Sequence, residues 1–208
     1  MKKLLVLLFS FLLLSSPSVI ADDISDFSIE GISIGDSLLD YMTEDEILKE
    51  IERTKNLYKN LKEPNKYAEI YLRKDFPAYS YMSFFIQNNS TNQYVTNKNE
   101  KYTIVFIRGM IDYIEDFDSC IQKRDEIVEA LSRMFPNTQK REEVFTSRSD
   151  PSGNSIIDNV TFIFDLNERI GARCNNWDEN FRIKLNLGEG LSVAIETQES
   201  IEWTSNYK

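Results

Sequence analysis

Residues 102–111 read YTIVFIRGMI, a stretch in which apolar side chains occupy both odd and even positions. Alternate residues of a β-strand point to opposite faces of a sheet, so a short run that is apolar on both faces is typical of a strand buried at the centre. We therefore expect this stretch to form a central strand, with the other elements arranged around it.

Other segments alternate apolar and polar residues, which predicts strands with one buried face. Their apolar positions are 68, 70 and 72; 82, 84 and 86; 160, 162 and 164; 181, 183, 185 and 187; and 191, 193 and 195. Between the last two, Gly188-Glu189-Gly190 predicts the turn of a hairpin. Two of these strands precede the central strand and three follow it.

Two further segments have apolar residues at helical spacing. Thr43 and Glu46 match a capping box, and apolar residues at 47, 51, 58 and 61 share one face until Pro64 ends the run. In the second segment we expect Asp118 or Ser119 to cap a helix that Pro136 closes, with residues 120, 127, 131 and 134 on one face. Charged residues lie on the opposite side of both helices, so both are amphipathic.

Each half of the chain is thus predicted to be a helix followed by three or more strands, and the acidic stretch 112–118 divides the halves. This order predicts an α+β fold in which two amphipathic helices pack on one face of a mainly antiparallel sheet. No segment has the composition of a linker between domains, so residues 22–208 are expected to form a single domain.

The first 21 residues have the three parts of a signal peptide. Lys2 and Lys3 are basic, residues 4–14 form an apolar run, and Val19 and Ala21 suit cleavage after Ala21. A bilayer core needs roughly twenty apolar residues, which is more than this run supplies. We therefore expect an exported soluble protein, periplasmic or extracellular, with no membrane insertion after cleavage.

The chain is acidic, with a net charge of −10 that becomes −12 when Lys2 and Lys3 are removed. Nucleic acids and anionic membrane surfaces bind basic proteins, so neither is expected as a partner. A protein partner and a small-molecule ligand both stay open.

Two cysteines are present, Cys120 and Cys174. An exported chain with two cysteines most simply forms one disulfide, and closing a loop of about 55 residues is worth roughly 4 kcal/mol. Two free thiols or a redox pair are the alternatives. The separation is unlike a C-x-x-C motif, which favours a structural disulfide.

Gly35-Asp36-Ser37-Leu38 resembles the first block of the GDSL, or SGNH, family of serine esterases. In that family a histidine near the C-terminus activates the serine, and this chain contains no histidine. A serine hydroxyl is a poor nucleophile without a neighbouring base. We therefore interpret the tetrapeptide as coincidental, with Asp36 or Ser37 capping a helical turn that begins at Leu38.

The lack of histidine also removes the usual ligand or base of zinc peptidases and Cys–His proteases. No glycine-rich phosphate-binding motif is present. We expect no catalytic residue, no metal and no cofactor, and consider an enzyme the less favoured class. A cluster of acidic residues could be read as a calcium site, but its spacing is wrong and the start of a helix explains it. Its members are Asp112, Glu115, Asp116 and Asp118.

Three segments together resemble small exported proteins of marine bacteria that have no assigned activity: residues 34–41, Cys120 with 123–132, and Cys174 ahead of Trp177. The resemblance implies export and no particular activity. Trp177 is expected to pack on the disulfide, the alternative being a ring that stacks on a sugar.

The sequence as a whole favours a non-catalytic binding or interaction module of the periplasm. The alternatives are a structural or assembly protein of the cell envelope and, less favoured, a glycan hydrolase. A hydrolase needs only two carboxylates across a cleft, and the chain has 34 acidic residues from which the sequence selects none.

Overall fold

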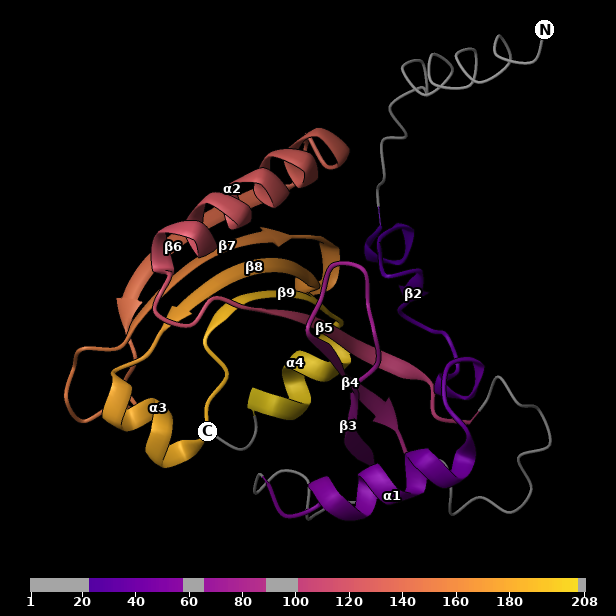
Figure 1. Ribbon diagram of the computed structural model, residues 1–208. Coiled ribbons are helices and arrows are strands. Elements are labelled where there is room, and N and C mark those ends of the chain that lie inside the picture. Colours follow the sequence, from indigo (N-terminus) through magenta and orange to yellow (C-terminus); the bar gives the residue numbers. More distant parts are fainter. Residues whose placement is uncertain (1–22, 58–65, 89–100, 206–208) are drawn as a thin grey trace, which may run out of the picture.

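The structure is a computed structural model that describes residues 23–57, 66–88 and 101–205. Within these ranges the chain forms a seven-stranded sheet, a small hairpin and four α-helices (Figure 1). The sheet contains β3 (Tyr67–Leu72), β4 (Tyr81–Gln87), β5 (Ile104–Asp112), β6 (Gln139–Thr146), β7 (Ile156–Ile163), β8 (Arg169–Asn176) and β9 (Gly190–Glu196). The other elements are β1 (Ser28–Ile29), β2 (Ile32–Ser33), α1 (Glu44–Thr54), α2 (Phe117–Met134), α3 (Glu179–Leu185), α4 (Gln198–Ser205) and 3-10 turns at Ile24–Asp26, Leu38–Asp40 and Asp165–Asn167.

The predicted α+β class with an antiparallel sheet is confirmed, but the described residues form four α-helices where two were predicted. The strand order is β3-β4-β5-β9-β8-β7-β6, and every neighbouring pair is antiparallel. β5 is a central strand, as predicted. β9, the last strand in the sequence, lies between β5 and β8, so it joins the two halves of the chain into one sheet.

Strand alternation gives the sheet two unlike faces. One row of directly opposed residues crosses six strands and is buried throughout; its members are Ile70, Phe84, Ile107, Ile195, Ile170 and Phe162. We call the face that carries this row the core face, and the opposite face, which carries Phe85, Arg108 and Arg173, the pocket face. No helix in the described part of the chain is long and apolar enough to cross a membrane.

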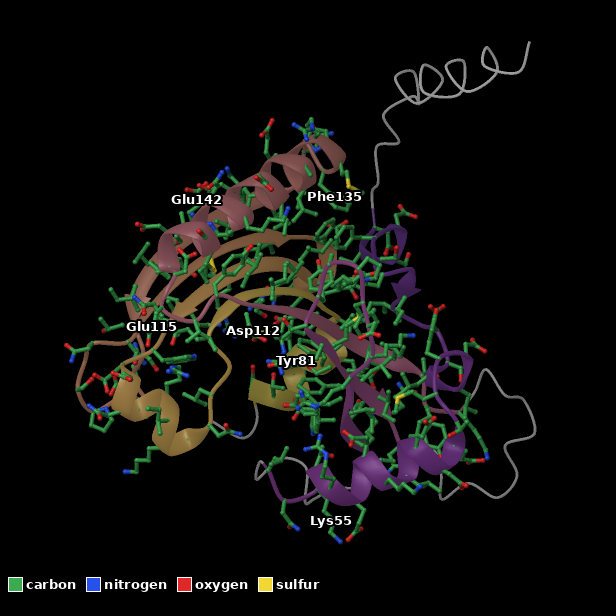
Figure 2. The ribbon with its side chains drawn as sticks, viewed as in Figure 1. Lys55, Tyr81, Asp112, Glu115, Phe135 and Glu142 are labelled. Atoms are coloured by element: carbon green, nitrogen blue, oxygen red, sulfur yellow. A yellow bond between two sulfur atoms is a disulfide. The ribbon has the colours of Figure 1, made fainter. Side chains whose placement is uncertain are left out.

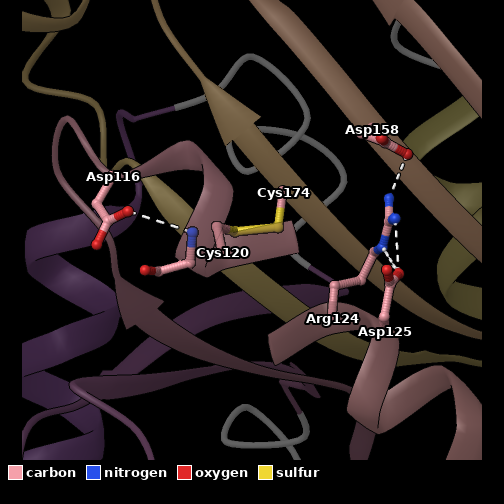
Figure 3. Close-up of a disulfide and its surroundings, with 7 residues drawn as sticks. Asp116, Cys120, Arg124, Asp125, Asp158 and Cys174 are labelled. Carbon is pink, nitrogen blue, oxygen red and sulfur yellow. Dashed lines mark hydrogen bonds and ion pairs between the residues drawn. A yellow bond between two sulfur atoms is a disulfide. The ribbon is translucent and has the colours of Figure 1, made fainter. Parts of the chain in front are cut away.

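Two contacts one helical turn apart hold α2 on the core face (Figure 3). The predicted disulfide joins Cys120 of α2 to Cys174 of β8, with 6.0 Å between the Cα atoms. Arg124, which is 8 % exposed, forms an ion pair with Asp158 on β7, the residue directly opposite Cys174. The helix is therefore tied to two neighbouring strands by a covalent bond and a largely buried charge pair.

The N-cap of α2 is Asp116, whereas Asp118 or Ser119 was predicted. The Asp116 side chain accepts a hydrogen bond of 3.2 Å from the Ser119 backbone N–H. The difference arises because Phe117, which packs on the core, is already the first helical residue. The helix ends at Met134, before Pro136, as expected.

α1 has the predicted capping box. The Thr43 backbone N–H donates to Glu46 Oε2 at 2.8 Å, and the Glu46 N–H donates to Thr43 Oγ1 at 3.4 Å. Residues 58–65, which include the predicted end of this helix, lie outside the described residues.

The two edges of the sheet are protected differently. α1 covers the edge of β3: Thr54 Oγ1 donates to the Glu69 carbonyl at 2.7 Å, and the Tyr71 N–H donates to a Glu50 oxygen at 3.2 Å. β6, at the other edge, is exposed along its whole length. It carries ion pairs of its own charged residues, of which Lys140–Glu142 spans 2.8 Å. Covering helices and edge charges both oppose pairing with other chains.

Residues 181–187 were predicted to be a strand, but residues 181–185 belong to helix α3 instead. Asp178 caps it by accepting a 3.0 Å hydrogen bond from the Phe181 N–H, and Asn186 ends it with a φ of 51°. Ile183 and Leu185 are exposed, so their alternation did not reflect a buried face. The predicted hairpin at Gly188-Glu189-Gly190 is therefore also wrong.

β6 and β8 were not predicted. β6 has no buried side to produce a pattern. In β8 the buried apolar residues are Ile170, Ala172 and Cys174, and two of these are too small to give a clear apolar signal. Phe164, predicted to belong to a strand, follows the end of β7.

The helices were predicted to lie on one face, and the structure places them on both. Figure 1 shows α2 outside the curved sheet and α4 within the curve. On α4, the Trp203 ring lies 4.8 Å from the Tyr67 ring and 5.1 Å from the Phe85 ring, between centroids. Glu199 accepts a 3.0 Å hydrogen bond from Gln87 Nε2. α4 therefore covers the β3–β5 part of the pocket face and leaves the rest open.

The loop between β6 and β7 is organised by Asp150, which is 5 % exposed. Its carboxylate accepts hydrogen bonds from the Ser152 N–H and hydroxyl at 2.9 and 2.7 Å, and from those of Ser155 at 3.0 and 2.7 Å. Burial alone would raise the pKa of Asp150, but these hydrogen bonds outweigh it and lower the pKa to about 2.

Asp150→Asn should reveal this pKa shift. Because the folded-state pKa is below the unfolded value of about 3.9, the charged carboxylate stabilises the fold above about pH 4, and the contribution is lost as the pH falls toward 2. We expect the variant to be less stable at pH 7, with the difference shrinking between about pH 4 and pH 2. Urea unfolding across this pH range measures it, and a difference independent of pH would contradict the prediction.

Replacing both cysteines by alanine should lower the free energy of unfolding by about 4 kcal/mol, because the disulfide closes a long loop in the unfolded chain. Urea unfolding of the variant and of the oxidised protein gives the difference. Adding a reductant to the double variant should change nothing, which controls for effects of the reductant itself. An equal stability of oxidised protein and variant would refute the structural role.

Candidate ligand-binding site

The pocket face contains an open cavity of about 450 Å³. Most of its lining residues lie on β5 to β9, with α4 at one side. The lining includes four arginines, two glutamates, three phenylalanines and several hydroxyl groups. A cavity of this size falls in the usual range for small-molecule sites, which is roughly 300–1,000 Å³. The lining is more polar than is typical, so it suits polar molecules better than apolar ones.

The floor of the pocket is made of small residues. Gly171 of β8 and Ala194 of β9 are directly opposite each other in the register. The same row continues to Arg108 on β5 in one direction and to Thr161 and Arg141 on β7 and β6 in the other. Strand pairing therefore places a floor of small side chains between Arg108 at one end of the row and Arg141 at the other.

Two more arginines flank the floor along β8. Arg169 and Arg173 are four residues apart, so both project from the pocket face, and their Cα atoms are about 13 Å apart in an extended strand. Gly171 lies midway between them. Arg173 is opposite Asn159 on β7 and Ser192 on β9, and Arg169 is opposite Glu196 on β9.

Aromatic rings and α4 close one end. Phe85 and Phe106 stack with 4.3 Å between ring centroids, and Trp203 of α4 meets Phe85 edge-on. Ser200 and Thr204 of α4 line the pocket beside them. Tyr81 of β4, labelled in Figure 2, lies on the same face of the sheet, in the row of directly opposed residues that also contains Arg173. The walls are thus held by packed side chains.

Two of the four arginines have carboxylate partners. Arg108 lies 3.4 Å from the buried Glu69 and donates from Nε to Ser83 Oγ at 3.0 Å. Arg141 pairs with Glu143 at 3.0 Å. Burial raises the pKa of Glu69, and the nearby Arg108 charge opposes this shift.

Arg169 and Arg173 are less well satisfied. The Nε atom of each is buried and has no hydrogen-bond partner among the described residues. Burial lowers the pKa of Arg173, repulsion from Arg108 lowers it further, and the Glu196 charge opposes both. Arg169 does donate from Nη2 to Asn167 Oδ1 at 3.1 Å. Buried N–H donors without an acceptor are costly, so the two buried Nε–H groups are available to an acceptor from outside the chain.

The GDSL-like tetrapeptide lies elsewhere and has a structural role. Ser37 is 2 % exposed, and its hydroxyl donates to the Lys101 carbonyl at 2.9 Å. It also accepts from the Leu39 N–H at 3.3 Å, as the cap of the 3-10 turn Leu38–Asp40. The predicted capping role of this segment is confirmed.

The other sequence-predicted features are also outside the pocket. The acidic cluster runs from the end of β5 through the connecting loop into the first turn of α2, and no group of metal-ligating side chains is found among the described residues. Trp177 donates to the Gly188 carbonyl at 2.8 Å and its ring lies 6.1 Å from that of Phe181. It is not among the described residues that pack on the core cluster containing the disulfide, where it was expected.

Sequence reasoning missed the pocket arginines. One signal was available: Arg169-Ile-Gly-Ala-Arg173 places two arginines and a glycine on the same face of a strand. Because β8 was not recognised as a strand, that spacing had no interpretation. The contributions of Arg108 and Arg141 depend on pairing between strands distant in sequence.

Comparison of the chain with protein-family models, with curated proteins and with solved structures finds no match. The geometry and chemistry of this pocket are therefore the basis for assigning a function.

Replacing Arg173 by methionine should stabilise the protein in the absence of ligand. The variant removes a buried, unpaired donor and a charge repelled by Arg108, and we expect a gain of roughly 1 kcal/mol. Arg133→Met on α2, which removes an exposed charge, serves as the matched control and should change stability by less than about 0.5 kcal/mol. Urea unfolding measures both, and a loss of stability in Arg173→Met would refute the argument.

Proposed function

We propose that this protein is an exported, non-catalytic binding module whose ligand occupies the pocket above Gly171 and Ala194. The signal-peptide pattern and the Cys120–Cys174 disulfide support export, because disulfides persist mainly in oxidising compartments. The shape and the polar lining of the pocket support a small polar ligand.

Gly171 is the observation that carries this proposal. Glycine in the interior of a strand weakens the strand, and often marks a place where a ligand or another backbone approaches closely. A Cβ atom added at Gly171 would have its nearest neighbours at 3.8 and 3.9 Å, which is ordinary contact. The φ angle of Gly171 is also not positive, so its backbone conformation is one that other residues adopt. Neither the packing nor the backbone of this chain requires glycine there.

The other two glycines of the large sheet have structural explanations. A Cβ atom at Gly109 would lie 2.5 Å from the Tyr79 ring, and one at Gly190 would lie 2.3 Å from the Ile111 carbonyl oxygen. Only at Gly171 is the space above the strand part of a cavity. An approaching ligand explains the glycine where protein contacts do not.

An assembly role in the cell envelope is the second candidate, because β6 is a fully exposed edge strand with Val144 68 % exposed. Its neighbouring ion pairs weaken that case, since charges on an edge disfavour pairing. A glycan hydrolase would have to use Glu143 and Glu196, the two glutamates that line the pocket. Glu143 already pairs with Arg141, which fits a binding surface better than an acid–base pair.

A thermal-shift screen tests the proposal. The protein, purified after export, is screened against sugars, amino acids, lipids, peptidoglycan fragments and calcium, in parallel with Gly171→Ala and Gly171→Leu. Both variants should melt at or above the wild-type temperature, because strand glycines cost about 0.5–1 kcal/mol relative to alanine. A compound that stabilises wild type should act less on the alanine variant and not on the leucine variant.

The outcome discriminates between the candidates. A stabilising compound whose effect disappears in Gly171→Leu places its site at the pocket floor. Equal stabilisation of all three proteins would put the site elsewhere and refute the proposed pocket. No stabilisation by any compound would favour the assembly role.

A further inference from the structure

The two arginines of β8 are arranged to receive an anion from outside the chain. Guanidinium groups present a planar fork of donors that matches carboxylates and tetrahedral oxyanions. Arg169 and Arg173 extend from opposite sides of the Gly171 floor, and each keeps a buried Nε–H without an acceptor among the described residues. A ligand group lying over the glycine is within reach of both side chains.

The charges that line the pocket are not balanced. Arg108 is paired with Glu69, and Arg141 with Glu143. Glu196 is the remaining pocket-lining carboxylate that can offset the positive charges of both β8 arginines. It is opposite Arg169 in the register, and its charge acts on Arg173. The centre of the pocket is therefore positive in a chain whose net charge is −10.

A neutral ligand would leave this arrangement unsatisfied. Uncharged hydroxyl oxygens could accept hydrogen bonds from the buried N–H groups, but they would not offset the excess positive charge. Charge-assisted hydrogen bonds are roughly twice as strong as neutral ones. Asn159 and Ser192, which flank Arg173 on either side, offer further hydrogen-bond donors to a bound anion.

We infer that the ligand carries an oxyanion, a carboxylate, sulfate or phosphate group, that binds over Gly171 between Arg169 and Arg173. This inference rests on the proposed function and specifies the chemical class of its ligand. The remaining lining, with the stacked Phe85 and Phe106 at one end, accommodates the uncharged part of the ligand.

The first experiment uses matched probes at constant ionic strength. Melting temperatures are measured with glucuronate against glucose, which differ at the carboxylate, and with succinate, inorganic sulfate and inorganic phosphate against sodium chloride. At one hundred times its Kd, an oxyanion should raise the melting temperature by about 5–11 °C. Glucose and chloride should leave it unchanged. The relative shifts of the carboxylates, sulfate and phosphate identify which oxyanion the pocket prefers.

Variants then locate the effect. Arg173→Met should abolish the shift, and Arg173→Lys should restore only part of it, because lysine keeps the charge but lacks the fork. Arg133→Met removes the same charge from α2, on the other side of the sheet, and should leave the shift intact. A shift equally reduced by Arg133→Met would mean that net charge acts at long range, and would overturn the inference.

The two proposals fail in different ways. Stabilisation by glucose that is lost in Gly171→Leu but kept in Arg173→Met would retain the pocket and refute the oxyanion. An oxyanion shift that persists in Gly171→Leu would refute the pocket as its site. If no oxyanion stabilises wild type more than chloride does, the oxyanion inference is wrong.

Discussion

The close contact between β5 and β9 is the constraint on which the rest of the structure depends. Gly190 has a φ of 131°, and a Cβ atom there would lie 2.3 Å from the Ile111 carbonyl oxygen, so a larger residue cannot occupy this point without displacing a strand. The contact lets the last strand of the chain enter between β5 and β8. Because β9 pairs with β5 on one side and with β8 on the other, it joins β3–β5 and β6–β8 into one sheet.

The same insertion creates the pocket. β9 contributes Ala194 to the floor and passes directly into α4, which packs on the β3–β5 part of the pocket face through Trp203. On the other face, the disulfide and the Arg124–Asp158 pair hold α2 across the second half of the sheet. One face is therefore closed by a tethered helix, while the other stays partly open and retains buried arginine donors. Rigid support behind a binding surface keeps such donors in position for a ligand.

The parts of the fold that sequence predicted correctly are those with a local signal. β3, β4 and β5 have strong alternation or continuous apolar runs, α1 has its capping box, and two cysteines allow only one intramolecular pairing. The failures have local causes too. Alternation at residues 181–187 competed with the Asp178 cap, which prevailed because Ile183 and Leu185 have no sheet to pack against. In β8 the small buried residues concealed the strand and, with it, the spacing of Arg169, Gly171 and Arg173.

The sequence by itself determined the central strand, the capping box of α1, the pairing of the two cysteines and the structural use of Ser37. The capping interactions depend on neighbouring residues, the central strand on a local apolar run, and two cysteines allow only one intramolecular pairing. Only the tertiary structure decided the place of β9, the division of the helices between two faces and the existence of the pocket. The pocket floor and its arginines come from strands paired out of chain order, so their proximity depends on backbone hydrogen bonds between distant segments. Such pairings leave no periodic signal along the chain, because backbone groups are the same at nearly every residue.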